Sequence, residues 1–354
     1  MDSALMHGLR RRESPHPVPS LVMTQTALIT GITGQDGAYL AELLLERGYR
    51  VVGGVRRTSG NGLERLERLG IDGDVEFVPL DLSDQASIRR ALELVRPDEI
   101  YNLAAQSFVG VSFDLPVMTG DVTGLGVARM LEAVRECAPG ARLYQASSSE
   151  MFGGARGGAL LNEQSAFAPR SPYAVAKLYA HWMCVTARES QGLHVCSGIL
   201  FNHESPLRGE EFVTRKVTRA AARIKLGMQT ELVVGNLDAQ RDWGYAREYV
   251  DAMHRMLQHD APGDWVVATG RAHSVRELIE QAFAAVDLDW RDHVRTDAAL
   301  LRPLDVDTLV GDAARARDEL GWAPSTTFAQ LVQLMVEADI ELAERELHAD
   351  GVLS

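Results

Sequence analysis

Lysine and cysteine are scarce in this sequence of 354 residues, and no long apolar run occurs in it. The three cysteines, Cys137, Cys184 and Cys196, are odd in number and lack metal-ligand spacing, so we expect neither a disulfide framework nor a metal site, and a reducing compartment. No segment approaches the ~20 apolar residues that cross a bilayer, and the apolar core of a signal peptide is missing. These absences predict a cytoplasmic protein.

Positive charge is also in short supply, since 36 Lys and Arg residues face 49 Asp and Glu residues and leave a net charge of −13. This balance argues against nucleic acid or an anionic membrane as the main partner. An acidic protein that binds a phosphorylated ligand must therefore gather its few cations in one place.

Residues 1–23 differ in composition from the rest of the chain. Arginines and prolines are concentrated there without a periodic apolar pattern, which predicts a disordered tail. A basic targeting arm is the alternative interpretation. Met23 directly precedes the first expected strand and could be the natural start.

From Thr26 on, short β-branched apolar runs alternate with longer segments of helical period, which is typical of a parallel sheet covered by helices. A glycine-rich turn follows the first run, and a helix expected at 38–47 ends at Gly48 before the second strand. Strands are expected at 27–30, 51–55, 76–80, 99–103, 142–146 and 196–200.

Six parallel strands predict an α/β fold with a Rossmann-type doubly wound parallel sheet in residues 24–200. Beyond residue 201 the pattern loosens, and later helices are expected around 274–285 and 327–346. We interpret residues 201–354 mainly as a smaller C-terminal α/β domain for the substrate, some of whose segments return to the Rossmann domain.

A G-x-x-G-x-x-G turn joins the first strand to its helix. Backbone N–H groups and a helix N-terminus at such a place can hold a pyrophosphate, so the turn predicts a dinucleotide site. A glycine triplet without this strand-turn-helix context would more simply be a tight turn. The residues of the turn are Gly31, Ile32, Thr33, Gly34, Gln35, Asp36 and Gly37.

The end of the second strand distinguishes NAD from NADP, because an acidic residue there binds the free ribose hydroxyl of NAD and repels an additional phosphate. Two guanidiniums and two hydroxyls occur there instead, which favours NADP, with a solvated basic turn as the alternative. These residues are Arg56, Arg57, Thr58 and Ser59. After the third strand, Asp81 and Leu82 are placed to meet the adenine, although Asp81 is equally suited to cap a helix.

Tyr173 and Lys177 lie one helical turn apart and share a helix face. The chain has only two other lysines, Lys216 and Lys225, so a lysine one turn after a tyrosine is not expected by chance. A phenol with a pKa of ~10 is a poor base at neutral pH, and lowering this value by ~3 units takes ~4 kcal/mol of preferential stabilisation of the phenolate. Lys177 and a cationic nicotinamide ring could supply it; an exposed helix tyrosine is the alternative.

Ser148 and Glu150 follow the strand expected at 142–146, at the edge where open α/β sheets bind ligands. In an extended segment the two side chains project to the same side. A hydroxyl and a carboxylate beside a tyrosine base suit removal of a carbon-bound proton next to a ketone, with loss of a leaving group. A serine turn that caps a helix near a surface glutamate is the plainer alternative.

With these motifs together, the chain resembles the extended short-chain dehydrogenases/reductases, and within them it is similar to the GDP-mannose 4,6-dehydratases. The resemblance covers residues 23–346. Its most specific stretches are GITGQDG at 31–37, YNLAAQS at 101–107, YQASSSE at 144–150, SPYAVAK at 171–177, FNHESP at 201–206, FVTRK at 212–216 and RDWG at 241–244.

The resemblance implies a hydro-lyase that regenerates its NADP internally and converts GDP-mannose into a GDP-4-keto-6-deoxy sugar. Tyr173 would take the C4 hydroxyl proton, Lys177 would hold the cofactor ribose, and Glu150 would remove the C5 proton as water leaves from C6. It further implies cofactor contacts from Leu103, Ala104, Ala105, Gln106, Ser107, His203 and Arg208, and substrate contacts from Asn202, Lys216, Arg241, Arg302 and Asp305.

Two departures from the family pattern concern this site. The family commonly has threonine where this chain has Ser148, which keeps the hydroxyl and loses a methyl group that restrains its rotamer. The late Arg-Pro motif usually carries a glutamate where this chain has Asp305, which shortens the reach towards the GDP ribose. We expect activity to survive the change at Ser148, whereas the change at Asp305 bears on which nucleotide is bound.

Three rival functions remain open at this point. A dehydratase of another GDP-sugar, such as GDP-manno-heptose, would differ mainly in room around C6. A nucleotide-sugar epimerase is disfavoured by Glu150, since epimerisation at C4 needs no C5 base. A non-catalytic NADP-binding protein would have no reason to retain Ser148, Glu150, Tyr173 and Lys177 together.

A homo-oligomer is implied by the resemblance, because relatives form dimers or tetramers. In some of them the loop after the residue that corresponds to Arg57 reaches a neighbouring subunit's cofactor. In this chain that loop, 58–62, has two glycines.

Overall fold

The computed structural model describes residues 24–56, 62–153, 160–300 and 308–349. The tail at 1–23 and the loop at 57–61 lie outside these residues, so the expectations for them stay predictions. The strands are β1 Thr26–Thr30, β2 Arg50–Val55, β3 Glu76–Pro79, β4 Glu99–Asn102, β5 Arg142–Ser148, β6 Val195–Leu200, β7 Asn202–Glu204, β8 Leu232–Val234, β9 Gln240–Arg241, β10 Trp243–Tyr245, β11 Asp264–Val267, β12 His273–Ser274, β13 Val294–Thr296 and β14 Thr308–Leu309.

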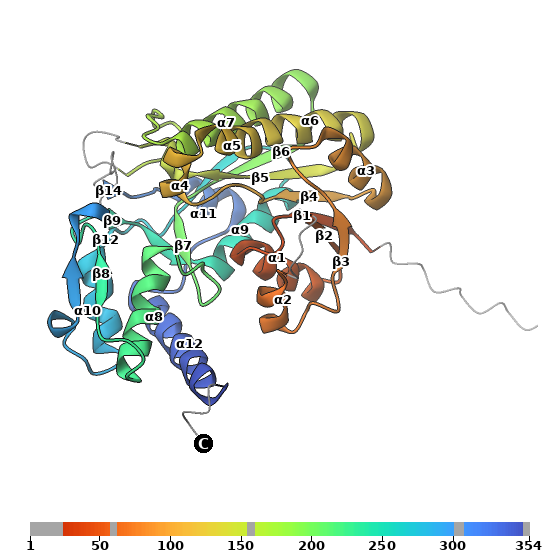
Figure 1. The fold of residues 1–354 in the computed structure, drawn as a ribbon. Coiled ribbons are helices and arrows are strands. Elements are labelled where there is room, and N and C mark those ends of the chain that lie inside the picture. Colours follow the sequence, from red (N-terminus) through yellow and green to blue (C-terminus); the bar gives the residue numbers. More distant parts are fainter. Residues whose placement is uncertain (1–23, 57–61, 154–159, 301–307, 350–354) are drawn as a thin grey trace, which may run out of the picture.

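The helices cover both faces of the central sheet and alternate with short strands in the second part of the chain (Figure 1). They are α1 Gln35–Glu46, α2 Glu64–Leu69, α3 Gln85–Val95, α4 Val109–Asp114, α5 Pro116–Thr119, α6 Gly126–Cys137, α7 Pro172–Gln191, α8 Val213–Lys225, α9 Ala246–Gln258, α10 Val275–Ala284, α11 Ala314–Leu320 and α12 Phe328–Ala349, with short turns η1 Gly120–Leu125, η2 Ser149–Met151, η3 Trp290–Asp292 and η4 Ala298–Leu300.

The central sheet has seven parallel strands in the order β11-β6-β5-β4-β1-β2-β3. It is of the Rossmann type, and all six strands expected from the sequence belong to it. The expected number of six was wrong, because β11 from beyond residue 201 adds a seventh strand beside β6. Its short DWVV run is buried, and such a run is too brief to be told from other buried segments by periodicity.

Two apolar cores lie on the two faces of this sheet. Helices α1 and α9 pack under one face, around Leu40, Leu44 and Met253, and α3, α6 and α7 cover the other, around Leu92 and Leu131. The helix expected at 38–47 begins three residues earlier, at Gln35, because Gly34 is its N-cap and the glycine turn runs directly into the first turn of the helix. That early start places the turn at the helix N-terminus.

A second group of elements is built around helices α8, α10 and α12 (Figure 1). These helices share an apolar core that includes Val217, Ile279 and Val336, and two small sheets, β13-β8 and β12-β9-β14, lie beside them. Elements after residue 201 therefore contribute to both groups, since α9, β11 and α11 return to the central sheet. No helix among the described residues is long and apolar enough to cross a membrane.

Candidate active site

A cavity of about 400 Å³ opens at the carboxyl ends of the central strands, between the sheet and helix α8. Segments from both groups of elements line it, which is the usual position of a ligand site in an open α/β sheet. The predicted site residues that it brings together are Asp36, Leu103, Ala105, Ser107, Ser148, Glu150, Tyr173, Lys177, Asn202, His203, Arg208, Lys216 and Arg241.

The glycine turn after β1 approaches neighbouring backbone closely. Gly31 has φ of +71°, and a Cβ placed on it would lie 2.8 Å from the backbone nitrogen of Ala104. A Cβ on Gly37 would collide with the Gly31 carbonyl and with Ile32. The turn is therefore restricted to glycine at both positions, and it leads directly into the N-terminus of α1, where backbone N–H groups can bind a phosphate.

The next residues of the turn connect it to β7. Gln35 donates to the carbonyl of His203 at 3.1 Å and accepts from the hydroxyl of Ser205 at 2.7 Å. His203 faces the Phe201 carbonyl at 2.8 Å with Nδ1 and Asp36 at 2.9 Å with Nε2, so both ring nitrogens meet acceptors. A doubly protonated, cationic ring satisfies both contacts.

Asp36 and His203 stabilise each other's charged forms. Burial by itself would raise the pKa of Asp36, but the charge and hydrogen bond of His203 outweigh it and lower the pKa to about 2. Burial also opposes the charged form of His203, yet the Asp36 carboxylate and the Phe201 carbonyl raise its pKa above the usual 6.5. No local pattern in the sequence indicates this ion pair, because its partners are 167 residues apart.

A buried polar chain supports the sheet edge beneath the cavity. Thr30, Asn102 and Gln145 are in-register partners on β1, β4 and β5. Thr30 donates to Asn102 at 2.7 Å, and Asn102 donates to Gln145 at 2.7 Å. The Thr30 hydroxyl also accepts from the backbone of Leu103 and Ala104, each at 3.1 Å, so it fixes the start of the segment that lines the cavity.

Ser148 is the last residue of β5 and is extended as expected, but the extended backbone expected to continue to Glu150 ends there. Glu150 lies in the short helical turn η2, because the Ser148 hydroxyl accepts from the Glu150 backbone at 3.2 Å and closes that turn. The capping alternative is thus realised locally. Both side chains nevertheless line the cavity.

Helix α7 carries Tyr173 and Lys177 into the same cavity. Ser171 caps its N-terminus by accepting from Ala174 at 3.1 Å, and Pro172 occupies the first turn, so the phenol enters the cavity from the first turn of the helix. Tyr173 is buried, and the Ser148 hydroxyl is near enough to lower the pKa of its phenol. The Lys177 ammonium lies 5.8 Å from the centre of the Tyr173 ring and donates to the Ala146 carbonyl at 2.7 Å.

The pKa of Tyr173 in the protein alone lies above the usual value for a phenol. Burial raises it to about 12, and the Ser148 hydrogen bond lowers it less than burial raises it. Burial likewise lowers the pKa of Lys177 to about 8. Burial is the largest influence on the phenol, and the Lys177 ammonium donates to the Ala146 carbonyl. The protein by itself therefore favours the neutral phenol. A further positive charge beside the ring is needed to make Tyr173 a base at neutral pH.

Cations gather on the opposite wall of the cavity. The Arg208 guanidinium lies 3.6 Å from the centre of the Phe212 ring and 3.1 Å from a carboxylate oxygen of Glu204. Lys216 donates to the Val233 carbonyl at 2.7 Å, and Arg241 on β9 is buried at the cavity lining. The few cations of an acidic chain are thus concentrated where a phosphorylated ligand would need them.

Several predicted residues do not line the cavity. The side chains of Ile32 and Leu82 are buried in apolar cores. Asp81 accepts from the backbone and hydroxyl of Ser83, whereas Asp84 caps α3, so the capping alternative for Asp81 was wrong. Arg56 is exposed at the end of β2, and its charge helps to lower the pKa of Asp81 after the Ser83 contacts and burial. Arg57, Thr58, Ser59, Arg302 and Asp305 lie outside the described residues.

Sequence reasoning missed Glu204 and Phe212. Glu204 is buried, accepts from the Thr214 hydroxyl and orients Arg208, and Phe212 supplies the ring under the same guanidinium. Both stand in the stretches FNHESP and FVTRK, so their place in a motif was the available signal. Among the described residues no cluster of His, Cys, Asp and Glu could hold a metal ion.

Comparison with known proteins gives concordant matches. A family model described as GDP-mannose 4,6 dehydratase matches residues 28–335. GDP-mannose 4,6 dehydratase 1 of Arabidopsis thaliana is 52% identical over 330 residues, which cover 90% of this chain and 91% of that protein. GDP-mannose 4,6 dehydratase of Homo sapiens is 47% identical over 341 residues, which cover 89% of this chain and 91% of that protein.

Solved structures show the same fold. DesIV, a dTDP-glucose 4,6-dehydratase from Streptomyces venezuelae with NAD and TYD bound, has a TM-score of 0.80 at 22% identity and covers 90% of this chain and 97% of its own. RMD from Pseudomonas aeruginosa complexed with NADPH has a TM-score of 0.74 at 26% identity and covers 90% of this chain and 100% of its own.

Proposed function

The chain belongs to the GDP-mannose 4,6-dehydratase family, and from this premise we propose how its cavity residues divide the work. The reaction is the loss of water from GDP-mannose, which makes the chain a hydro-lyase and yields a GDP-4-keto-6-deoxy sugar. The observation that carries the assignment of roles is that Ser148, Glu150, Tyr173 and Lys177 line one cavity.

The enzyme binds a nicotinamide dinucleotide, and we propose that it is NADP. The close-packed turn at Gly31 and Gly37 fits a pyrophosphate, and Arg56 rather than an acidic residue follows β2. His203 and Arg208 add positive charge beside the same turn. When bound, the cofactor supplies a hydride acceptor at the start and a hydride donor at the end, so no net oxidation occurs.

Oxidation at C4 is the task of Tyr173. Its phenolate takes the proton of the C4 hydroxyl, and the hydroxyl of Ser148 holds the phenol oxygen in place. Because burial raises the pKa of Tyr173 to about 12 in the protein, the base forms only where extra positive charge lies against the ring. Lys177, 5.8 Å from the centre of the Tyr173 ring, would hold the ribose of the bound cofactor and add part of that charge.

Elimination is the task of Glu150. A ketone at C4 acidifies the C5 proton, and the carboxylate at the cavity wall can remove it and pass a proton to the departing C6 hydroxyl, which leaves as water. Reduction at C6 and return of a proton to C5 then complete the 6-deoxy sugar. The carbon-bound proton is what distinguishes this chemistry from simple epimerisation at C4, which needs no base at C5.

The guanosine diphosphate lies against the second group of elements. Asn202, Lys216 and Arg241 line that end of the cavity, and their cations suit a diphosphate. The corresponding proposals for Arg302 and Asp305 concern residues outside the described part of the chain.

We further propose that the enzyme works in the cytoplasm as a homo-oligomer. Helices α5 and α7 contact each other and expose several large apolar side chains, among them Val117, Val175 and Trp182 at 83%, 55% and 54%. An apolar surface of this kind is typical of contacts between protein chains. Sedimentation analysis of wild type and Trp182→Glu tests it; a monomeric wild type would contradict it.

The decisive experiment incubates the purified enzyme with GDP-mannose and catalytic NADP in D₂O, with mass spectrometry and proton NMR as readouts. Wild type should remove one water, produce a 6-methyl signal, incorporate deuterium and accumulate no NADPH. Glu150→Gln should still oxidise C4 and therefore trap reduced cofactor, whereas Tyr173→Phe should do neither. Full elimination by Glu150→Gln would refute its role.

Parallel reactions with NAD and with GDP-manno-heptose refine the proposal. Equal turnover with NAD would refute the preference for NADP. Turnover of the heptose with GDP-mannose left unchanged would keep the mechanism and replace the substrate.

A further inference from the structure

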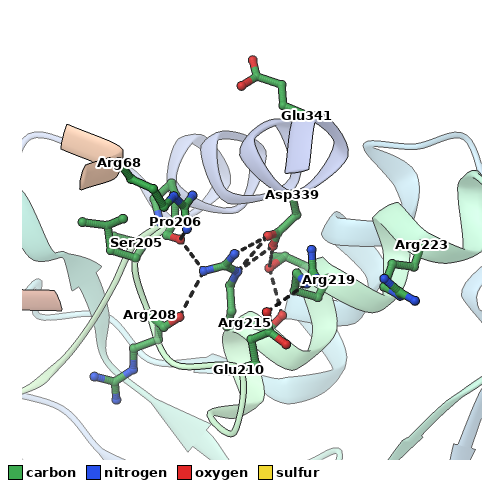
Figure 2. A network of polar contacts seen from close by, with 12 residues as sticks. Arg68, Ser205, Pro206, Arg208, Glu210, Arg215, Arg219, Arg223, Asp339 and Glu341 are labelled. Carbon is green, nitrogen blue, oxygen red and sulfur yellow. Dashed lines mark hydrogen bonds and ion pairs between the residues drawn. The ribbon is translucent and has the colours of Figure 1, made fainter. Parts of the chain in front are cut away.

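A buried ion pair outside the cavity joins two helices of the second group of elements (Figure 2). Arg215 on α8 and Asp339 on α12 have side chains that are 2% and 0% exposed. Nη2 of Arg215 lies 2.7 Å from Asp339, and its Nε donates to both carboxylate oxygens at 2.8 and 3.0 Å. The pair is separated by 124 residues in sequence.

Apolar packing already joins these two helices. Val217 and Ala221 of α8 share a core with Val332 and Val336 of α12. Further along the helices, Arg219 and Arg223 of α8 both form ion pairs with Glu346 of α12. Because burying two charges costs desolvation energy, an apolar pair of similar volume would join α8 and α12 at least as well. The joining of the two helices therefore does not explain why a charged guanidinium stands at this position.

The third nitrogen of the Arg215 guanidinium, Nη1, makes hydrogen bonds that an apolar side chain could not make. Nη1 of Arg215 donates to the carbonyl of Pro206 and, at 3.0 Å, to the carbonyl of Arg208 (Figure 2). The segment 205–208, which we call the arginine loop, is thereby attached to α8. Asp339 neutralises and orients the guanidinium, and Thr218 donates to Asp339 at 2.7 Å.

The cofactor side of the molecule holds the same loop. Arg65 on α2 donates to the Leu207 carbonyl at 2.7 Å and to the Thr33 carbonyl of the glycine turn at 3.0 Å. Ser205 donates to Gln35 of the turn at 2.7 Å. Successive carbonyls of the arginine loop are thus bound by guanidiniums from α2 and from α8, so the loop is fixed relative to both.

This fixation determines where the Arg208 side chain goes. In Figure 2 the Arg208 carbonyl faces Arg215, while its guanidinium extends in the opposite direction. There it lines the cavity, against Phe212 and Glu204. A long side chain loses much rotational freedom on binding a ligand, so a loop that presets its origin and direction lowers that cost.

We propose that Arg215, neutralised by Asp339, is a positioning residue that presents Arg208 to the dinucleotide phosphates. This inference rests on the proposed role of Arg208 in cofactor binding. It assigns the buried ion pair to the arginine loop and not to the joining of α8 and α12.

The test exchanges the ion pair for an apolar pair and follows NADPH binding by fluorescence titration together with thermal unfolding of the free protein. Arg215→Met with Asp339→Leu should still fold, since buried ion pairs can be replaced in this way, with an unfolding temperature lowered only by the loss of partners for the Pro206 and Arg208 carbonyls and the Thr218 hydroxyl. NADPH affinity should nevertheless fall about fivefold, because the loop carbonyls lose their donors. The control Arg223→Met, which removes one of the two ion pairs between α8 and Glu346 of α12, should leave affinity unchanged.

A double-mutant cycle identifies the route of the effect. Arg208→Met should weaken NADPH binding roughly tenfold, as expected for a charge-assisted contact to a phosphate. In that background the same apolar exchange, Arg215→Met with Asp339→Leu, should cost less than about twofold more, since Arg208 is the residue it acts through. Additive losses would overturn the positioning role.

Other outcomes separate the two proposals. If Arg208→Met leaves NADPH affinity unchanged, Arg208 has no cofactor role and the inference fails with it. If Arg208→Met weakens binding but the apolar exchange does not, the proposed cofactor role stands and the positioning role is wrong. Should the apolar exchange fail to fold, Arg215→Lys retains the charge for Asp339 without the fork that reaches two carbonyls, and the same losses are expected of it.

Discussion

The two walls of the cavity are built in different ways. On the sheet wall, Ser148 ends β5 and Glu150 lies in the turn η2 that follows. Tyr173 and Lys177 stand on the first turns of α7, so regular elements aim each side chain. On the loop wall, Arg208 belongs to no helix or strand and is aimed by side chains from α2 and α8. The difference suggests that the sheet wall controls the chemical step and the loop wall controls affinity.

The sharpest test of this comparison is Tyr173→Phe, which removes one oxygen from the sheet wall. We expect kcat to fall about 10³-fold, because proton transfer by a positioned side chain contributes roughly 10²–10⁴ to the rate. NADPH affinity should change little. Tyr179→Phe, on the same helix with its ring 43% exposed, is the matched control and should keep full activity. A large loss of affinity in Tyr173→Phe would break the division between the walls.

The support of the sheet wall gives the next largest effect. Thr30→Val removes the hydroxyl that bonds Asn102 and the backbone of Leu103 and Ala104. Leaving such groups buried and unpaired should lower the free energy of unfolding by roughly 3 kcal/mol, measured by urea denaturation. Thr26→Val, at the other end of β1, is the control, since among the described residues no hydrogen bond of its hydroxyl is lost. Equal losses in the two variants would show that the polar chain contributes nothing special.

Substitutions of glycine can separate the energetic cost of a positive φ from the cost of a steric collision in the glycine turn. Gly31 and Gly48 have similar φ values of +71° and +78°, but only at Gly31 would a Cβ meet other atoms within 4 Å. Gly48→Ala should therefore cost about 1 kcal/mol for the backbone conformation, and Gly31→Ala about 2 kcal/mol more for the collision with Ala104. Urea denaturation measures both, and equal costs would contradict the close approach.

The sequence predicted the residues of the sheet wall better than the contacts that support the loop wall. All six expected strands are in the sheet, and Ser148, Glu150, Tyr173 and Lys177 meet in one cavity, because short local patterns specify the elements that carry them. The seventh strand was missed, since β11 is short and distant in sequence from β6. Contacts such as Arg215 with Asp339 had no local signal at all, because each partner alone reads as a surface charge on a helix.

The pKa of Tyr173 in the protein could also not be predicted from the sequence. Spacing places Lys177 one turn away, but only the structure shows that its ammonium donates to the Ala146 carbonyl and that burial dominates the phenol. Sequence spacing reports which groups are near one another. The balance between desolvation and charge depends on depth and orientation, which spacing does not report.

The smallest predicted effect concerns the ion pair of Asp36 and His203, which links the glycine turn to the loop wall. The pKa of Asp36 is lowered from 3.8 to about 2, so its contribution to stability is complete above pH ~3.8 and is lost as the pH falls towards 2. The pKa of His203 is raised above 6.5, so its contribution is complete below pH ~6.5 and is lost as the pH rises through the raised value. The pair is therefore strongest between about pH 4 and 6.5.

Asp36→Asn should accordingly reduce the free energy of unfolding by about 1.5 kcal/mol near pH 5.5, allowing for the 23% exposure of the Asp36 side chain, and by less at pH 3 and at pH 9. Urea denaturation at these three pH values gives the measurement. In a His203→Gln background the same substitution should show no such maximum, because the charged partner is gone. A pH-independent loss would mean that Asp36 acts through hydrogen bonds to Gln35 rather than through the charge of His203, and the loop wall would then be joined to the turn without an ion pair.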